Sequence, residues 1–125
     1  MTALQAFIVE DNQVIRENLA AALEELVPLQ VVGQAEDVPS ALGWLDSGHP
    51  CDVVIIDVFL REGSGIDLLR ALAQREHRAE RVVLTNYATP DIRRRCLELG
   101  ASQVFDKSSD IEALVAYCAQ LARPN

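Results

Sequence analysis

The alternation of short apolar runs with segments of helical spacing limits the fold of this chain more than any other feature. Each run is too short for a helix and precedes a segment whose apolar residues recur at helical spacing. Such a chain forms a parallel sheet, because parallel strands need a connection long enough to hold a helix. The predicted strands cover residues 5–9, 30–35, 53–56, 82–84 and 103–106, and a helical segment follows each of them.

The third run, Val53-Val54-Ile55-Ile56, is the most hydrophobic and predicts a central strand covered on both faces. Right-handed crossovers place helices on both sides of a parallel sheet. We therefore expect one α/β domain over residues 1–125, a doubly wound, flavodoxin-like sheet of five parallel strands in the order 2-1-3-4-5 with five helices.

Helix ends are also indicated by particular residues. Pro90 suits a first helical position, and Gly100 suits the end of the same helix. Ser109 and Glu112 have the spacing of a capping box, which predicts that Ser109 caps the last helix.

Polar side chains follow the first, third, fourth and fifth predicted strands, namely Glu10-Asp11, Asp57, Thr85 and Lys107. The second strand runs into Glu36-Asp37, but in the order 2-1-3-4-5 it lies at the far edge of the sheet. The carboxyl ends of parallel strands collect at one edge of a sheet. The order 2-1-3-4-5 also places the ends of the first and third strands side by side. We expect three carboxylates, one hydroxyl and one ammonium to share a crevice, with Asp57 at its centre.

An acidic group of this kind suits Mg²⁺, which prefers oxygen ligands and keeps several waters. Asp11 and Asp57 are the predicted direct ligands, and Glu10 is predicted to hold a coordinated water. The backbone carbonyl of Phe59 is the predicted further ligand. Once the ion offsets the negative charge, the Asp57 carboxylate becomes a plausible nucleophile for phosphoryl transfer.

Two other residues suit the phosphoryl oxygens: Thr85 would donate a hydrogen bond, and Lys107 would pair with a second oxygen. Each residue also has an ordinary structural interpretation. Asp11 alone is equally consistent with a helix N-cap, Thr85 with a packing role and Lys107 with an exposed lysine. Their joint occurrence at successive strand ends favours the chemical interpretation.

These motifs resemble the receiver domain of two-component response regulators over essentially the whole chain. The resemblance rests on Val9-Glu10-Asp11-Asn12, Asp57-Val58-Phe59-Leu60, Gly65, Thr85 and Lys107. It implies that Asp57 accepts phosphate from a sensor histidine kinase or a histidine phosphotransfer protein. It also implies a movement of Thr85 toward the aspartyl phosphate and slow self-catalysed hydrolysis. Such a domain is a phosphoacceptor regulator rather than an enzyme, and it signals through changed protein contacts.

Four positions depart from the family pattern. Arg61 and Ser108 stand where prolines are common, Asn86 stands where a smaller residue is usual, and Val104 occupies the place of a switching aromatic residue. Arg61, Asn86 and Val104 keep open a pseudo-receiver that binds partners without phosphorylation, although the retention of all five chemical positions argues against it. A magnesium-dependent phosphatase with an aspartyl-phosphate intermediate is a further alternative, although Phe59 stands where such enzymes carry a second acid.

The charge of the chain restricts its partners. A formal net charge of −8 over 125 residues repels nucleic acid and anionic membranes. No apolar run is long enough to span a membrane, which predicts a cytoplasmic protein. The three cysteines have neither disulfide-framework nor zinc-site spacing. The run Arg93-Arg94-Arg95 is either a solvated helix face or a docking surface for an acidic downstream protein.

Overall fold

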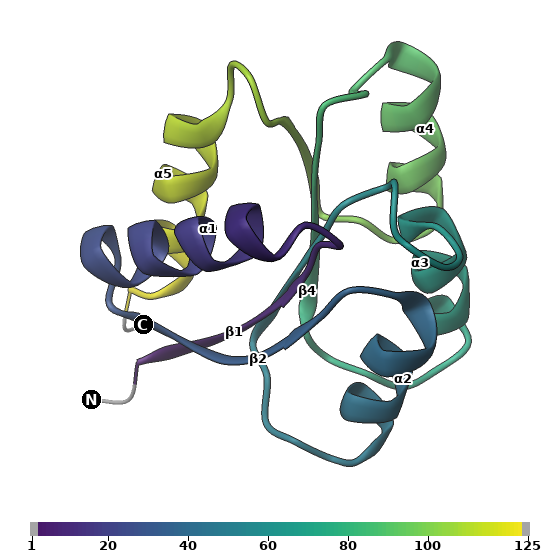
Figure 1. The fold of residues 1–125 in the computed structure, drawn as a ribbon, viewed down its shortest axis with the longest axis horizontal. Helices are drawn as coiled ribbons and strands as arrows, with labels where there is room; N and C mark the ends of the chain where they lie inside the picture. The colour runs from purple at the N-terminus through teal and green to yellow at the C-terminus, as the bar shows by residue number, and fades with distance from the viewer. Residues whose placement is uncertain (1–2, 124–125) are drawn as a thin grey trace.

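The computed structural model describes residues 3–123, and within them five strands alternate with five helices (Figure 1). The strands are β1 (Leu4–Val9), β2 (Leu29–Ala35), β3 (Val53–Ile56), β4 (Glu80–Thr85) and β5 (Gln103–Asp106). They pair in parallel in the order β2-β1-β3-β4-β5. The predicted doubly wound sheet is confirmed.

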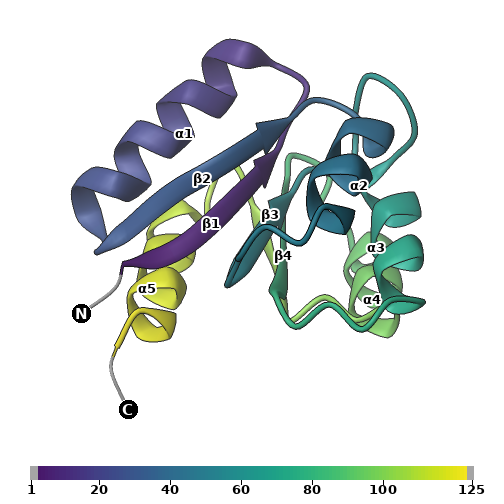
Figure 2. The same cartoon turned by 90° about the horizontal axis from the view of Figure 1, so that it is seen from below.

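Helices cover both faces of this sheet, as Figures 1 and 2 show. Helices α1 (Gln13–Leu26) and α5 (Ile111–Leu121) lie on one face. Helices α2 (Val38–Asp46), α3 (Gly65–Ala73) and α4 (Pro90–Glu98) lie on the other. None of these described helices is long and apolar enough to cross a bilayer.

Each face of the sheet has its own apolar core, because successive side chains of a strand point to opposite sides. Ile8 and Ile55 pack with Leu23 and Leu114 beneath α1 and α5. Phe7, Val54 and Ile56 belong to the other core, with residues of α2, α3 and α4. All four residues of β3 are buried, so the prediction of a central strand is confirmed.

Hydrogen-bonded caps fix the start of most helices, but not in the predicted way for α5. Ser64 and Asp67 form a reciprocal capping box at α3. The capping box predicted for Ser109 and Glu112 is wrong, because Asp110 occupies the N-cap position and makes no side-chain cap bond. Its carboxylate instead accepts a hydrogen bond from the Asp106 N–H at 2.9 Å.

The connection after β5 also has ordinary backbone geometry. No cis peptide bond occurs among the described residues, so the bond between Lys107 and Ser108 is trans. The Lys107 N–H donates to the Thr85 carbonyl at 3.0 Å, which extends the pairing of β4 and β5 by one residue.

Candidate functional site

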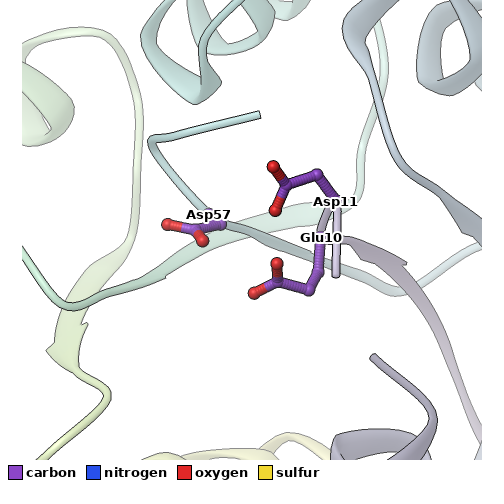
Figure 3. Close-up of side chains that lie close together, drawn as sticks. All are labelled: Glu10, Asp11 and Asp57. Carbon is purple, nitrogen blue, oxygen red and sulfur yellow. The ribbon is translucent and has the colours of Figure 1, made fainter. Parts of the chain in front are cut away.

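Three carboxylates meet at the carboxyl edge of the two central strands (Figure 3). Glu10 and Asp11 follow β1, and Asp57 follows β3. The Asp57 N–H donates to the Val9 carbonyl at 3.0 Å, which holds the two strand ends side by side. Each residue offers one oxygen, and these three oxygens lie within 4.8 Å of one another. The predicted grouping of the acids is therefore present.

Asp11 is free to face this site because its neighbour caps the helix. The N-cap of α1 is Asn12, whose Oδ1 accepts a hydrogen bond from the Ile15 N–H at 3.0 Å. The alternative interpretation of Asp11 as the cap is excluded by this arrangement. Glu10 is also fixed, since its Oε2 accepts from the Asn12 N–H at 3.0 Å.

Lys107 reaches into the acidic group from the end of β5. Its Nζ donates to Asp57 Oδ2 at 2.8 Å and also contacts Glu10 Oε1. The lysine side chain is largely buried, which rules out the interpretation as an ordinary surface lysine. One ammonium is thus placed between two of the three carboxylates.

Burial and charge act in opposite directions on these groups. Burial raises the pKa of Asp57, and the ammonium of Lys107 only partly offsets that effect. Burial disfavours the charged form of Lys107, but hydrogen bonds to Asp57 and Glu10 overcome it and leave the lysine pKa raised. Lys107 therefore stays charged at neutral pH, where it favours the ionised form of Asp57.

The donor set of this site fits a hard divalent cation. Three carboxylates with one ammonium leave excess negative charge, and all three acids offer oxygen, which Mg²⁺ prefers. Phe59 follows two residues after Asp57, and its N–H lies 3.4 Å from Asp57 Oδ1. The residues expected to hold magnesium therefore stand on the two strand ends that meet here.

Thr85 lies at the same edge of the sheet, at the end of β4 next to β3. It is completely buried, and its Oγ1 accepts a hydrogen bond from the Tyr87 N–H at 3.3 Å. The hydroxyl hydrogen of Thr85 is not used in this bond.

A close backbone contact fixes the loop between β3 and α3. The Gly65 N–H donates to the Val58 carbonyl at 2.8 Å. A Cβ atom at Gly65 would lie only 2.2 Å from the Asp57 carbonyl oxygen. Any residue with a side chain would push against the backbone of Asp57. This contact explains why position 65 is a glycine.

The structure shows where three of the departures from the family pattern lie. The Arg61 N–H donates to the Glu36 carbonyl at 3.4 Å. A proline at position 61 would have no N–H and could not make this bond. Asn86 is exposed. Val104 is buried in the core beneath α2, α3 and α4. Phe105 packs in the opposite core near Tyr117, so its ring does not replace an aromatic residue at position 104.

The three consecutive arginines of α4 do not act as one basic surface. Arg93 donates to the Ala88 carbonyl at 3.0 Å and the Val104 carbonyl at 2.9 Å, and lies 3.5 Å from Asp110. Arg94 pairs with Asp91 on its own helix. Arg95 is exposed. The basic patch predicted from the sequence is therefore smaller than its three residues suggest.

Some contacts at the site were missed by sequence reasoning. Arg16 reaches back from α1 and donates to the Glu10 carbonyl at 2.7 Å. The rings of Phe59 and Tyr87 contact each other across two loops. Their spacing in the sequence gives no signal of these contacts, because each depends on how separate segments meet in space.

Comparison with known proteins gives a consistent assignment. The family model described as response regulator receiver domain matches residues 6–119. The DNA-binding transcriptional activator DevR/DosR of Mycobacterium tuberculosis is 33% identical over 99 residues, which are 79% of this chain and 45% of that protein. This chain spans about half the length of the first curated relatives that it matches.

Solved structures show the same fold. A DNA-binding response regulator from Staphylococcus aureus superposes with a TM-score of 0.86 at 16% identity, covering 96% of this chain and 99% of that one. A response regulator from Burkholderia pseudomallei, solved with a phosphorylated aspartic acid, calcium ion and citrate, has a TM-score of 0.79 at 26% identity. That match covers 90% of this chain and 65% of the other. With a strand-end acidic site and a family match over most of its length, this chain belongs to the response regulator receiver domain family.

Proposed function

We propose that this protein is a signalling switch whose residues 1–125 form one receiver domain and which accepts a phosphoryl group on Asp57. The observation that supports this most strongly is the position of the Asp57 carboxylate, 2.8 Å from Lys107 Nζ and within a group of three acids. The similar Burkholderia protein carries a phosphorylated aspartic acid together with a calcium ion. A nucleophile, a cation site and a fixed ammonium are the parts that phosphoryl transfer requires.

The residues of the site have distinct parts in this reaction. A carboxylate oxygen of Asp57 attacks the phosphorus of a phosphohistidine, the phosphorus–nitrogen bond breaks, and the imidazole leaves with its electron pair and is protonated. Lys107 then pairs with a phosphoryl oxygen, and Thr85 donates a hydrogen bond to another. A bound Mg²⁺ would neutralise the developing charge, held by Asp11, Asp57, a water on Glu10 and the Phe59 carbonyl.

The partners follow from this chemistry. The proposed donors are a sensor histidine kinase or a histidine phosphotransfer protein in the cytoplasm. Transmission would occur through altered contacts with a downstream protein, for which the exposed Arg94 and Arg95 on α4 are candidate contacts. We propose no binding of nucleic acid or membrane by this chain, because its net charge of −8 opposes both.

Acetyl phosphate provides a direct test of phosphorylation. The protein is incubated with this donor with and without Mg²⁺, and its intact mass is compared with that of Asp57→Ala. We expect a gain of one phosphoryl group that needs Mg²⁺ and is absent in the variant. Failure of the wild type to gain mass under both conditions would contradict the proposal and favour a pseudo-receiver. Rapid steady release of inorganic phosphate would instead favour an aspartyl-phosphate phosphatase.

A further inference from the structure

An arginine near the start of α1 joins the acidic site to the edge strand β2. The Nη1 atom of Arg16 donates to the Glu10 carbonyl at 2.7 Å. Its Nε donates to the side-chain oxygen of Gln34, on β2, at 2.9 Å. Because a guanidinium is planar and rigid, the bond to Gln34 also fixes the direction of the bond to Glu10. Strand β2 carries none of the three acids, yet it supports them through this pair.

Glu10 is held at each of its polar groups, and Arg16 supplies the bond that the sheet does not. The Glu10 N–H donates to the Ala35 carbonyl at 3.0 Å, where β2 ends. The Glu10 side chain accepts from the Asn12 N–H at 3.0 Å and contacts Lys107. The Glu10 carbonyl lies beyond the last paired residues of β1 and β2 and accepts from Arg16 instead. Because Glu10 is only 3% exposed, removal of Arg16 would leave this carbonyl short of a hydrogen-bond partner.

The same bond sets the position of Asp11. A peptide unit is planar, so the Glu10 carbonyl, the Asp11 nitrogen and the Asp11 Cα lie in one plane. A carbonyl held by Arg16 therefore fixes the direction in which the chain leaves Glu10. The side chains of Glu10 and Asp11 extend from this turn toward Asp57 (Figure 3). One guanidinium thus constrains the backbone of two of the three acids.

We infer that Arg16, oriented by Gln34, is a positioning residue that sets the affinity of the acidic site for a divalent cation. An arginine side chain has only donors, so it acts through the backbone of Glu10 and Asp11 and not as a ligand. Groups that orient the ligands of a metal strongly influence the affinity for that metal. The inference rests on the proposed function for the identity of the ion, which is Mg²⁺.

The charge of Arg16 and its hydrogen bonds have opposite effects on cation binding. A guanidinium near the acids repels a divalent cation, so its removal would tighten binding if charge alone mattered. Its hydrogen bonds hold Glu10 and Asp11 in place before the ion arrives. Their removal would weaken binding, because the ordering of two acids would then oppose it. The sign of the change in affinity therefore tells the two effects apart.

Calorimetric titration with Mg²⁺ tests the inference on the unphosphorylated protein. The wild type and Arg16→Ala are titrated at the same pH and ionic strength. We expect the dissociation constant for Mg²⁺ to rise about tenfold in Arg16→Ala, at the lower end of the range for loss of a group that orients a metal ligand. Equal or tighter binding in this variant would overturn the inference.

Three further variants separate charge from geometry. Arg16→Lys keeps the charge but cannot make both bonds from one rigid group, so we expect its binding to be about threefold weaker. Gln34 is exposed, and Gln34→Ala removes only the partner that orients Arg16, with an expected loss of about twofold to threefold. The double variant of Arg16→Ala and Gln34→Ala should match Arg16→Ala within about twofold, because Gln34 acts through Arg16. Weakening by the full product of the two single effects would overturn the role of Gln34.

Phosphorylation by acetyl phosphate shows whether the effect is limited to the cation. Arg16→Ala should need about tenfold more Mg²⁺ for half-maximal phosphorylation. Its rate at saturating Mg²⁺ should return to within about twofold of the wild-type rate, with an unchanged half-maximal concentration of acetyl phosphate. A rate that stays low at saturating Mg²⁺ would indicate general damage to the site and would overturn the inference.

Arg75→Ala is the matched control. Arg75 also donates to a backbone carbonyl, that of Ala71, and to a side chain, that of Asp46. It follows the end of α3, whereas Asp57 precedes the start of that helix. Arg75→Ala should therefore bind Mg²⁺ as the wild type does. A loss of affinity equal to that of Arg16→Ala would show that the effect is not specific to the site and would overturn the inference.

The inference and the proposed function can fail separately. If the wild type binds Mg²⁺ but gains no phosphoryl group, the proposed function fails, and the calorimetric comparison still decides the role of Arg16. If the wild type gains a phosphoryl group but Arg16→Ala binds Mg²⁺ as tightly as the wild type, only the inference fails. If the wild type binds no Mg²⁺, both fail.

Discussion

Substitution of Gly65 by alanine tests whether the loop after Asp57 is as tightly packed as the structure shows. The added Cβ would lie 2.2 Å from the Asp57 carbonyl oxygen, whereas ordinary contacts begin at 3.4 Å. The backbone must therefore move by about 1.2 Å. Because the opposing atom belongs to the main chain, a change of rotamer cannot relieve the contact.

Such overpacking costs about 1–3 kcal/mol, and we expect the upper part of this range at Gly65 because two backbone segments must separate. The same movement would weaken the hydrogen bond from the Gly65 N–H to Val58 and the capping box of Ser64. Urea unfolding gives the free energy directly, and the melting temperature should fall by roughly 2–8 °C per kcal/mol. Phosphorylation by acetyl phosphate should also slow.

Gly43→Ala is the matched control for this experiment. Gly43 lies inside α2, and a Cβ there would meet nothing within 4 Å. Alanine should therefore stabilise the protein by about 0.5–1 kcal/mol through its better helix propensity. The reasoning is wrong if Gly65→Ala unfolds within about 0.5 kcal/mol of wild type, or if both substitutions shift stability in the same direction.

Three further predictions follow from the site and its supports. Mg²⁺ at one hundred times its dissociation constant should stabilise the protein by about 2.7 kcal/mol in urea unfolding, and the stabilisation should be lost in Asp11→Asn; an equal effect in that variant would exclude Asp11 as a ligand. Burial raises the pKa of Cys118 from 9.0 to about 11, so above pH 9 the unfolded chain loses a proton that the folded chain keeps. Cys118 should contribute about 2 kcal/mol to the fall in unfolding free energy between pH 8 and 10.5, so the fall should be smaller by about that amount in Cys118→Ala. Arg93→Ala should cost about 1–3 kcal/mol because two carbonyls lose a charged donor, whereas Arg94→Ala should change stability by less than about 0.5 kcal/mol. Equal losses of stability in Arg93→Ala and Arg94→Ala would contradict the conclusion that the hydrogen bonds of Arg93 to these two carbonyls stabilise the fold.

The fold was predictable because several sequence signals agree with one another. The β-branched run of β3 indicated a buried central strand, and the residues around it indicated the alternating helices. The grouping of Glu10, Asp11 and Asp57 followed from the parallel topology alone, since it requires only that the ends of β1 and β3 be adjacent. Properties that depend on strand order and direction are therefore accessible from a single sequence.

The failures concern side chains that have several possible partners. Ser109 has the spacing of a cap, but Asp110 takes that position and bonds to the backbone of Asp106. Arg93 looks like its two neighbours in the sequence, yet it alone turns toward the carbonyls of Ala88 and Val104. A sequence gives the charge and spacing of these residues but not the direction in which they point.

The identity of the phosphorylated residue tests the central proposal most directly. Three carboxylates lie within one small site, so a gain in mass alone does not tell which of them carries the phosphoryl group. Borohydride reduces an aspartyl phosphate to homoserine, and peptide mass spectrometry then locates the altered residue. We predict homoserine at position 57 only after treatment with acetyl phosphate and Mg²⁺. Modification of Asp11 or Glu10 instead, or none at position 57 in a protein that gained mass, would contradict the proposal.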